Sequence, residues 1–148
     1  QVWDNEQKIV RRRKPAKYHF TNMLGALSWH PAHLRSIEAF KNLDSAEQGK
    51  WYEWMVAQEL WRRDAVAGED MPEMLMFWKN KEHEIDFFTR GNRYIEVKRG
   101  DCDPQEFLWF PRTFGKRAHL TVINQRRFST EFCTGITLED FLLESRNG

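Results

Sequence analysis

Short apolar runs separated by turn residues dominate the second half of the chain. Three of them, at 74–78, 84–89 and 93–98, follow one another closely and predict three strands. Residues 90–92, Arg-Gly-Asn, are a turn signal, so the second and third strands are expected to form a hairpin. A β-branched apolar run at 118–123 predicts a buried strand.

Helical spacing marks other segments. Residues 49–63 are apolar nearly all round a helix, which predicts a buried helix with Asp44 or Ser45 as its N-cap. A short strand is expected at 18–20. Two helices are expected after it, one from Asn22 to 27 and one from Pro31 to 40. Further helices are expected from Pro104 to 114, between Asp103 and Gly115, and at 137–143 with Thr137 as the cap. The sequence therefore predicts an α/β fold.

The hairpin carries the candidate chemistry, and its register decides where the side chains lie. Strand alternation puts Glu96 and Lys98 on one face, and Ile95 and Val97 on the other. On the preceding strand, Ile85 and Phe87 are expected to form the matching apolar set. A three-residue loop pairs Thr89 with Arg93 and brings Asp86 opposite Glu96, whereas a one-residue slip would expose the whole apolar set.

Two facing carboxylates repel each other unless a cation lies between them. Mg²⁺, or Mn²⁺ in its place, takes one or two carboxylates and completes its shell with water and phosphate oxygens. Lys98 is expected to position water or offset charge on the reacting phosphate. Glu53, on the apolar helix, is a candidate third carboxylate; the alternative is an ion pair with Arg62 or Arg63. Another interpretation of Glu96 and Lys98 is a solvated cross-strand charge pair.

Composition limits the class of protein. The 148 residues predict one domain at 18–143, preceded by a basic linker or edge segment at 1–17 that contains Arg11, Arg12, Arg13 and Lys14. A net charge of +1 neither demands nor excludes a nucleic-acid partner. The two cysteines fit neither a disulfide framework nor a zinc spacing, so a reducing cytoplasm is expected, and no apolar run reaches the length of a membrane span. Because the chain starts at Gln1 in an irregular charged stretch, we expect it to be a piece of a longer protein.

These motifs carry a resemblance. The order helix–strand–strand–strand–helix–strand, with Glu53, Asp86 and Glu96-Val97-Lys98, resembles the PD-(D/E)XK nuclease superfamily. More narrowly, the chain resembles one prokaryotic group of the superfamily. In that group a nuclease-like domain follows an AAA-type ATPase module. The matching stretches are Lys17-Tyr18-His19-Phe20-Thr21-Asn22, Gly49-x-x-x-Glu53 with Leu60, Phe77-Trp78, Glu84-Ile85-Asp86-Phe87 and Ile95-Glu96-Val97-Lys98.

The resemblance implies a restriction-endonuclease-like core (αβββαβ) with a mixed central sheet flanked by helices. It also implies metal ligation by Asp86, Glu96 and the Val97 carbonyl, Lys98 as the catalytic lysine, and Glu53 as the RecB-like helix carboxylate. Ile85 stands where the superfamily commonly has proline, and no Walker A loop occurs, so any ATPase lies outside this chain.

The expected function is Mg²⁺-dependent hydrolysis of a phosphodiester, in DNA rather than RNA, by a domain attached to an AAA-type ATPase. The alternative from another class is a catalytically silent nucleic-acid-binding or protein-interaction module of that ATPase. A third interpretation treats the four charged residues as a buried ion-pair network alone.

Other polar and aromatic residues have structural explanations. Spacing places Trp51, Trp54 and Trp61 in the core rather than against nucleobases, and His83 is expected in a solvated turn beside the acidic strand. Gln105 and Arg112 are candidates for substrate contact, with surface solvation as the simpler explanation. The candidates for a basic rim near the strand ends, where phosphate binding would depend on salt, are Lys116, Arg117, Arg126 and Arg127.

Overall fold

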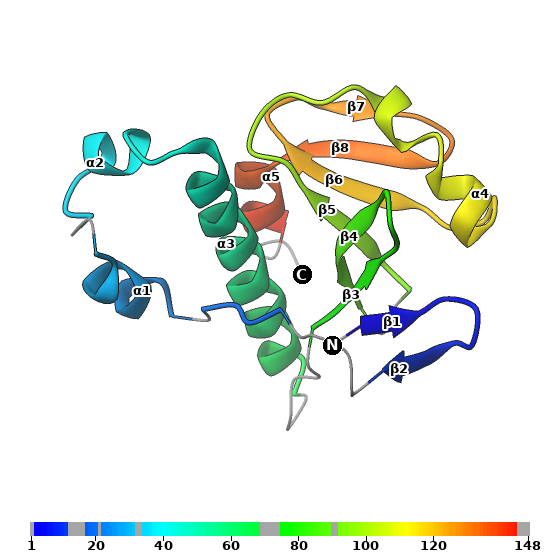
Figure 1. Cartoon of the computed structure of the whole chain (residues 1–148), viewed down its shortest axis with the longest axis horizontal. Coiled ribbons are helices and arrows are strands. Elements are labelled where there is room, and N and C mark those ends of the chain that lie inside the picture. Colours follow the sequence, from blue (N-terminus) through cyan, green and yellow to red (C-terminus); the bar gives the residue numbers. More distant parts are fainter. Residues whose placement is uncertain are drawn as a thin grey trace. The chain divides into compact units, whose positions relative to one another are not determined.

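The computed structural model describes residues 2–11, 17–20, 22–31, 34–68, 75–89 and 92–144. These residues form two compact units (Figure 1): Gln1–Lys17 with Glu73–Gly148, and Tyr18–Pro72. The predicted basic residues Arg12, Arg13 and Lys14 lie outside the described residues.

The first unit is built on an eight-stranded mixed sheet in the order β2-β1-β3-β4-β5-β6-β8-β7. Its strands are β1 (Val2–Asp4), β2 (Ile9–Arg11), β3 (Met76–Lys79), β4 (Glu84–Phe88), β5 (Tyr94–Val97), β6 (Leu120–Asn124), β7 (Phe128–Ser129) and β8 (Cys133–Thr137). Strands β3, β4 and β5 pair antiparallel, whereas β6 lies parallel to both β5 and β8. The predicted α/β class is confirmed.

Three short helices accompany this sheet: η1 (Pro104–Phe107), α4 (Phe110–Phe114) and α5 (Leu138–Leu143). The predicted helix at 104–114 is therefore present in two pieces. Asp103 begins it with a capping box, and Gly115, at φ +91°, ends it where other residues would be strained. Phe107 and Phe110 are buried in one core cluster with residues of β3, β4, β5, β6 and β8, so these helices cover one face of the sheet.

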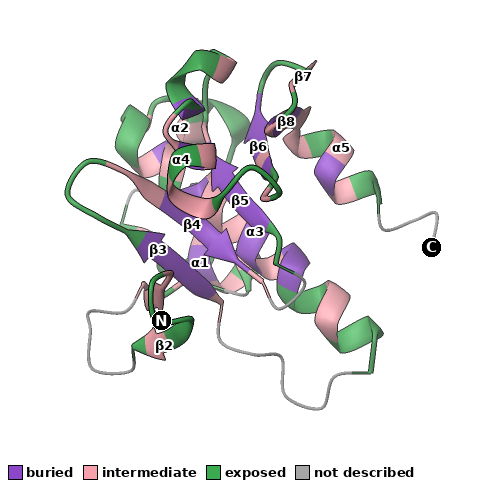
Figure 2. Cartoon of the chain, turned by 90° about the vertical axis from the view of Figure 1, so that its right-hand side faces the viewer, coloured by how far each residue is buried: buried purple, intermediate pink, exposed green. Residues whose placement is uncertain are grey.

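The hairpin of β4 and β5 has the predicted register. Phe87 pairs with Ile95 and Phe88 with Tyr94, and the Thr89 N–H donates to the Arg93 carbonyl. The turn residues Arg90 and Gly91 lie outside the described residues, whereas Asn92 closes the turn at φ +54°. Both strands are buried along most of their length (Figure 2).

A β-bulge in β4 makes one prediction wrong. Met76 pairs with Phe88 and Trp78 with Ile85, so Asp86 and Phe87 together span the single residue Phe77 of β3. The extra residue breaks the alternation of side chains. Ile85 therefore joins Phe88 in the core cluster under the helices, whereas Phe87 pairs with Ile95.

The second unit contains α1 (Met23–Trp29), α2 (Ile37–Lys41) and α3 (Ser45–Val66). Asn22 and Asp44 cap α1 and α3 as predicted, each accepting a backbone N–H of the first turn. Two predictions are wrong. Residues 18–20 form no strand, and the helix after Pro31 begins only at Ile37, because Ser36 supplies its cap.

Only part of the predicted apolar surface of α3 is buried. Trp51 is 3% exposed and packs with Ala26, Leu34 and Trp54, but Trp61 is 45% exposed, so its placement in the core was wrong. Within the described segments, no helix is both long enough and apolar enough to cross a membrane.

Candidate functional site

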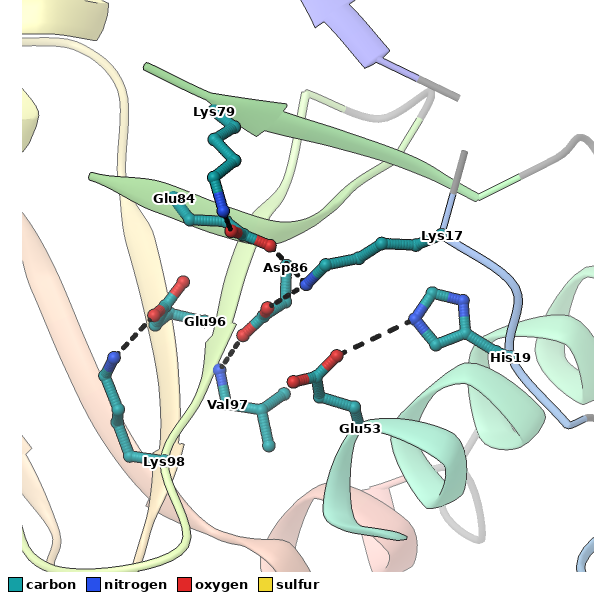
Figure 3. Close-up of polar contacts among 9 residues, drawn as sticks. All are labelled: Lys17, His19, Glu53, Lys79, Glu84, Asp86, Glu96, Val97 and Lys98. Carbon is teal, nitrogen blue, oxygen red and sulfur yellow. Dashed lines mark hydrogen bonds and ion pairs between the residues drawn. The ribbon is translucent and has the colours of Figure 1, made fainter. Parts of the chain in front are cut away.

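Asp86 and Glu96 lie on neighbouring strands, and both are buried, at 6% and 5% exposed. The hairpin register brings them to the same level of the sheet, as predicted. At this level the Asp86 side chain takes part in the pairing of the strands: its Oδ2 accepts the backbone N–H of Val97 at 2.9 Å (Figure 3). Asp86 belongs to the bulge, so its carboxylate can reach the Val97 N–H, which in a regular ladder would donate to a backbone carbonyl of β4.

Glu96 has one satisfied oxygen and one unsatisfied oxygen. Lys98 Nζ lies 2.8 Å from Oε1, so the predicted proximity of Glu96 and Lys98 is confirmed. Oε2 is buried and has no hydrogen-bond donor among the residues that the structure describes. Burial, followed by the charge of Asp86, raises the pKa of Glu96 to about 8, and Lys98 only partly opposes these effects.

Lys98 is held charged by its surroundings. Its burial alone would lower the pKa of the ammonium, but the carboxylates of Glu96, Asp86 and Glu106 outweigh burial and raise that pKa. Its side chain is still 41% exposed, so the ammonium is accessible from solvent. Lys98 thus combines a fixed positive charge with access to an incoming molecule.

Lys17 and Glu84 complete the charged cluster, and sequence reasoning did not include them in the site. Lys17 Nζ lies 2.8 Å from Asp86 Oδ1 and also forms an ion pair with Glu84 Oε1, while Lys79 Nζ lies 2.6 Å from Glu84 Oε2. Burial would raise the pKa of Glu84, but hydrogen bonds from Lys17 and Lys79 lower it. Glu84 could have been found from its position two residues before Asp86, whereas Lys17 is 69 positions away from Asp86.

Glu53 belongs to the second unit. Its Oε2 lies 3.9 Å from Nε2 of His19. Arg62 and Arg63, which were the predicted alternative partners, both pair with Glu59 further along α3. A role for Glu53 beside Asp86 and Glu96 stays a prediction.

A metal site must be judged against these contacts. No group of three or more His, Cys, Asp or Glu side chains in the described part of the chain is arranged to hold a metal ion. Two carboxylates nevertheless suffice for Mg²⁺ when water and substrate supply the other ligands. The donorless Oε2 of Glu96, buried beside a second carboxylate, is an oxygen that a cation would satisfy. Asp86 and Glu96 therefore fit such an ion. Val97 contributes its N–H to Asp86, and its carbonyl as a ligand stays a prediction.

The other candidates contact residues outside this cluster or are exposed. His83 stacks on Trp109, with 4.2 Å between ring centroids, and Arg127 forms two hydrogen bonds to Asp140. Gln105 and Arg112 are exposed, as expected for solvated residues. Three residues of the predicted basic rim, Lys116, Arg117 and Arg126, are also exposed.

Comparison of the chain with protein-family models, curated proteins and solved structures finds no match. Asp86 and Glu96 offer oxygen ligands to a hard cation, and Lys98 offers an ammonium at the same place.

Proposed function

We propose that this domain is a Mg²⁺- or Mn²⁺-dependent nuclease of the PD-(D/E)XK type that hydrolyses phosphodiester bonds in DNA. The observation that carries the proposal is the juxtaposition of Asp86, Glu96 and Lys98 on two paired strands, with a buried Glu96 oxygen that lacks a donor. The order α3, β3, β4, β5, α4, β6 also agrees with a restriction-endonuclease-like αβββαβ core.

Each residue has a role in the proposed reaction. Asp86 and Glu96 would hold the cation, which when bound polarises the scissile phosphate and lowers the pKa of water. Lys98 would hold the attacking water or offset the charge that develops on the phosphate oxygens. The Val97 N–H and Lys17 keep the Asp86 carboxylate in place. We place Glu53 as a supporting carboxylate and an AAA-type ATPase as the neighbouring module, on the family resemblance.

One observation favours a competing function. Three carboxyl groups (Glu84, Asp86, Glu96) lie against three lysine ammonium groups (Lys17, Lys79, Lys98), so each of them has a partner without a metal. That pairing is what a catalytically silent binding module would need for stability.

Plasmid nicking separates the two functions. With Mn²⁺, the wild-type protein should nick supercoiled DNA, and Lys98→Ala should lower the rate about 100-fold or more, as does the loss of one transition-state donor elsewhere. Lys81→Ala, which removes an exposed lysine from the β3–β4 turn, is the matched control and should keep the wild-type rate. An inactive wild type, or activity that survives Lys98→Ala, would reject the nuclease.

A further inference from the structure

A pocket lies at the turn end of the β4–β5 hairpin. It has a volume of about 700 Å³, within the range of small-molecule sites, and belongs entirely to the sheet unit. β1, the β1–β2 turn, β4, β5 and the segment leading into β6 all contribute to its lining.

The lining of this pocket is cationic. Lys8, Arg93 and Arg117 are exposed at its rim, together with His119, and none of its lining residues is acidic. The guanidinium groups of Arg93 and Arg117 form no ion pair or hydrogen bond with other described residues. Both groups are therefore available to a ligand, and a guanidinium binds phosphate oxygens through two parallel hydrogen bonds.

Aromatic side chains also line the pocket. Trp3 packs on Phe88, with 4.7 Å between ring centroids, and it lines the pocket as a partly exposed side chain. An anion such as inorganic phosphate would use only the rim. A ligand that carries both a phosphate and a flat ring would also use Trp3, because base stacking on aromatic side chains contributes about 1–3 kcal/mol per base.

We infer that this pocket binds a nucleotide unit of a single nucleic-acid strand, with the phosphate at Arg93 and Arg117 and the base at Trp3. This ligand would be the substrate of the proposed nuclease, so the role of the pocket rests on that proposed function. Tyr94, which lines the pocket, precedes Glu96 by two residues on β5, so the two side chains share a face of the sheet roughly 7 Å apart. A strand held here would reach the carboxylate site within a few nucleotides, so the pocket would position substrate for cleavage.

The test measures binding without cleavage. A fluorescein-labelled hexathymidylate is titrated with the intact chain in EDTA, at several salt concentrations, and anisotropy gives the Kd. Arg93→Ala/Arg117→Ala should raise the Kd about tenfold or more. It should also reduce the slope of log K against log salt by about 0.7, the value for the one phosphate that the variant no longer neutralises.

The control variant is Arg112→Ala/Arg126→Ala, which removes two exposed arginines of the same unit that do not line the pocket. The inference fails if the two double variants lose affinity equally, or if Arg93→Ala/Arg117→Ala binds as the wild type does. It also fails if inorganic phosphate or hexaglutamate competes as well as dTMP, because the site would then recognise charge alone. Since EDTA removes the metal, binding that persists in a protein inactive with Mn²⁺ would reject the nuclease and leave the pocket intact.

Discussion

Lys17 Nζ lies 2.8 Å from Asp86 Oδ1, although 69 positions separate the two residues. The same ammonium pairs with Glu84 and lies 5.7 Å from the centre of the Phe77 ring. It therefore joins the end of the N-terminal segment to the middle of the sheet, at the carboxylate on which the proposed function depends.

Replacing Lys17 should destabilise the sheet unit. Lys17→Met removes an ammonium from a buried carboxylate, and we expect a loss of about 2 kcal/mol in the free energy of unfolding, measured by urea denaturation. Lys79→Met, which removes a lysine whose side chain is 62% exposed, should cost less than about 1 kcal/mol. Equal losses in the two variants would show that the Lys17–Asp86 ion pair adds nothing beyond an exposed one.

Glu96 should make the stability of the protein depend on pH. Its pKa is raised from its usual 4.5 to about 8, so between these values the folded state holds a proton that the unfolded state releases. Stability should therefore fall as the pH rises from 4.5 to 8. Glu96→Gln should remove this dependence and raise the Tm at pH 9 by about 5 °C. Glu139→Gln, at an exposed position, should leave the dependence of stability on pH unchanged. If the wild type and Glu96→Gln showed the same dependence, the effect of burial on Glu96 would be contradicted.

A bound cation should offset the loss of stability that Glu96 causes at high pH. Mn²⁺ at about 100 times its Kd should raise the Tm of the wild type by about 5 °C, as measured by calorimetry. Because the metal displaces the proton on Glu96, one fixed Mn²⁺ concentration should give a larger shift at pH 8 than at pH 6. Asp86→Ala should show no shift. A wild-type Tm that ignores Mn²⁺ would favour the ion-pair network over the metal site.

Gly135 should not tolerate a side chain. It pairs with Phe128 across β7 and β8, and a Cβ at Gly135 would lie 2.3 Å from the Phe128 ring. Gly135→Ala should cost about 1–3 kcal/mol through displacement of β7. At Gly100 a Cβ would meet nothing within 4 Å, so Gly100→Ala is the matched control in the same denaturation experiment. A neutral Gly135→Ala variant would mean that the Phe128 ring turns aside freely.

The parts of the fold set by local chemistry could be predicted from the sequence. The register of β4 and β5 follows from a three-residue turn, and the starts of α1, α3 and α5 follow from Asn22, Asp44 and Thr137 as caps. These features involve only neighbouring residues, which is why Asp86, Glu96 and Lys98 could be placed together.

Features that depend on distant segments could not be predicted. The bulge at Asp86 results from how β3 pairs with β4, and the Lys17 ion pair depends on the path of the N-terminal segment. Strand β8 was missed because Gly135 interrupts its short apolar pattern, and β7 was missed because it has only two residues. The exposure of Trp61 could not be predicted either, because an apolar residue on a helix is buried only if another element covers it.

The two edges of the sheet have a consequence for behaviour at high concentration. The sheet ends at β2 and β7, which are three and two residues long. Long, flat edge strands recruit strands from other molecules and so begin aggregation. Edges this short leave few unpaired backbone groups to recruit another chain, and they protect a protein whose inner strands β3, β4, β5 and β6 are mostly buried.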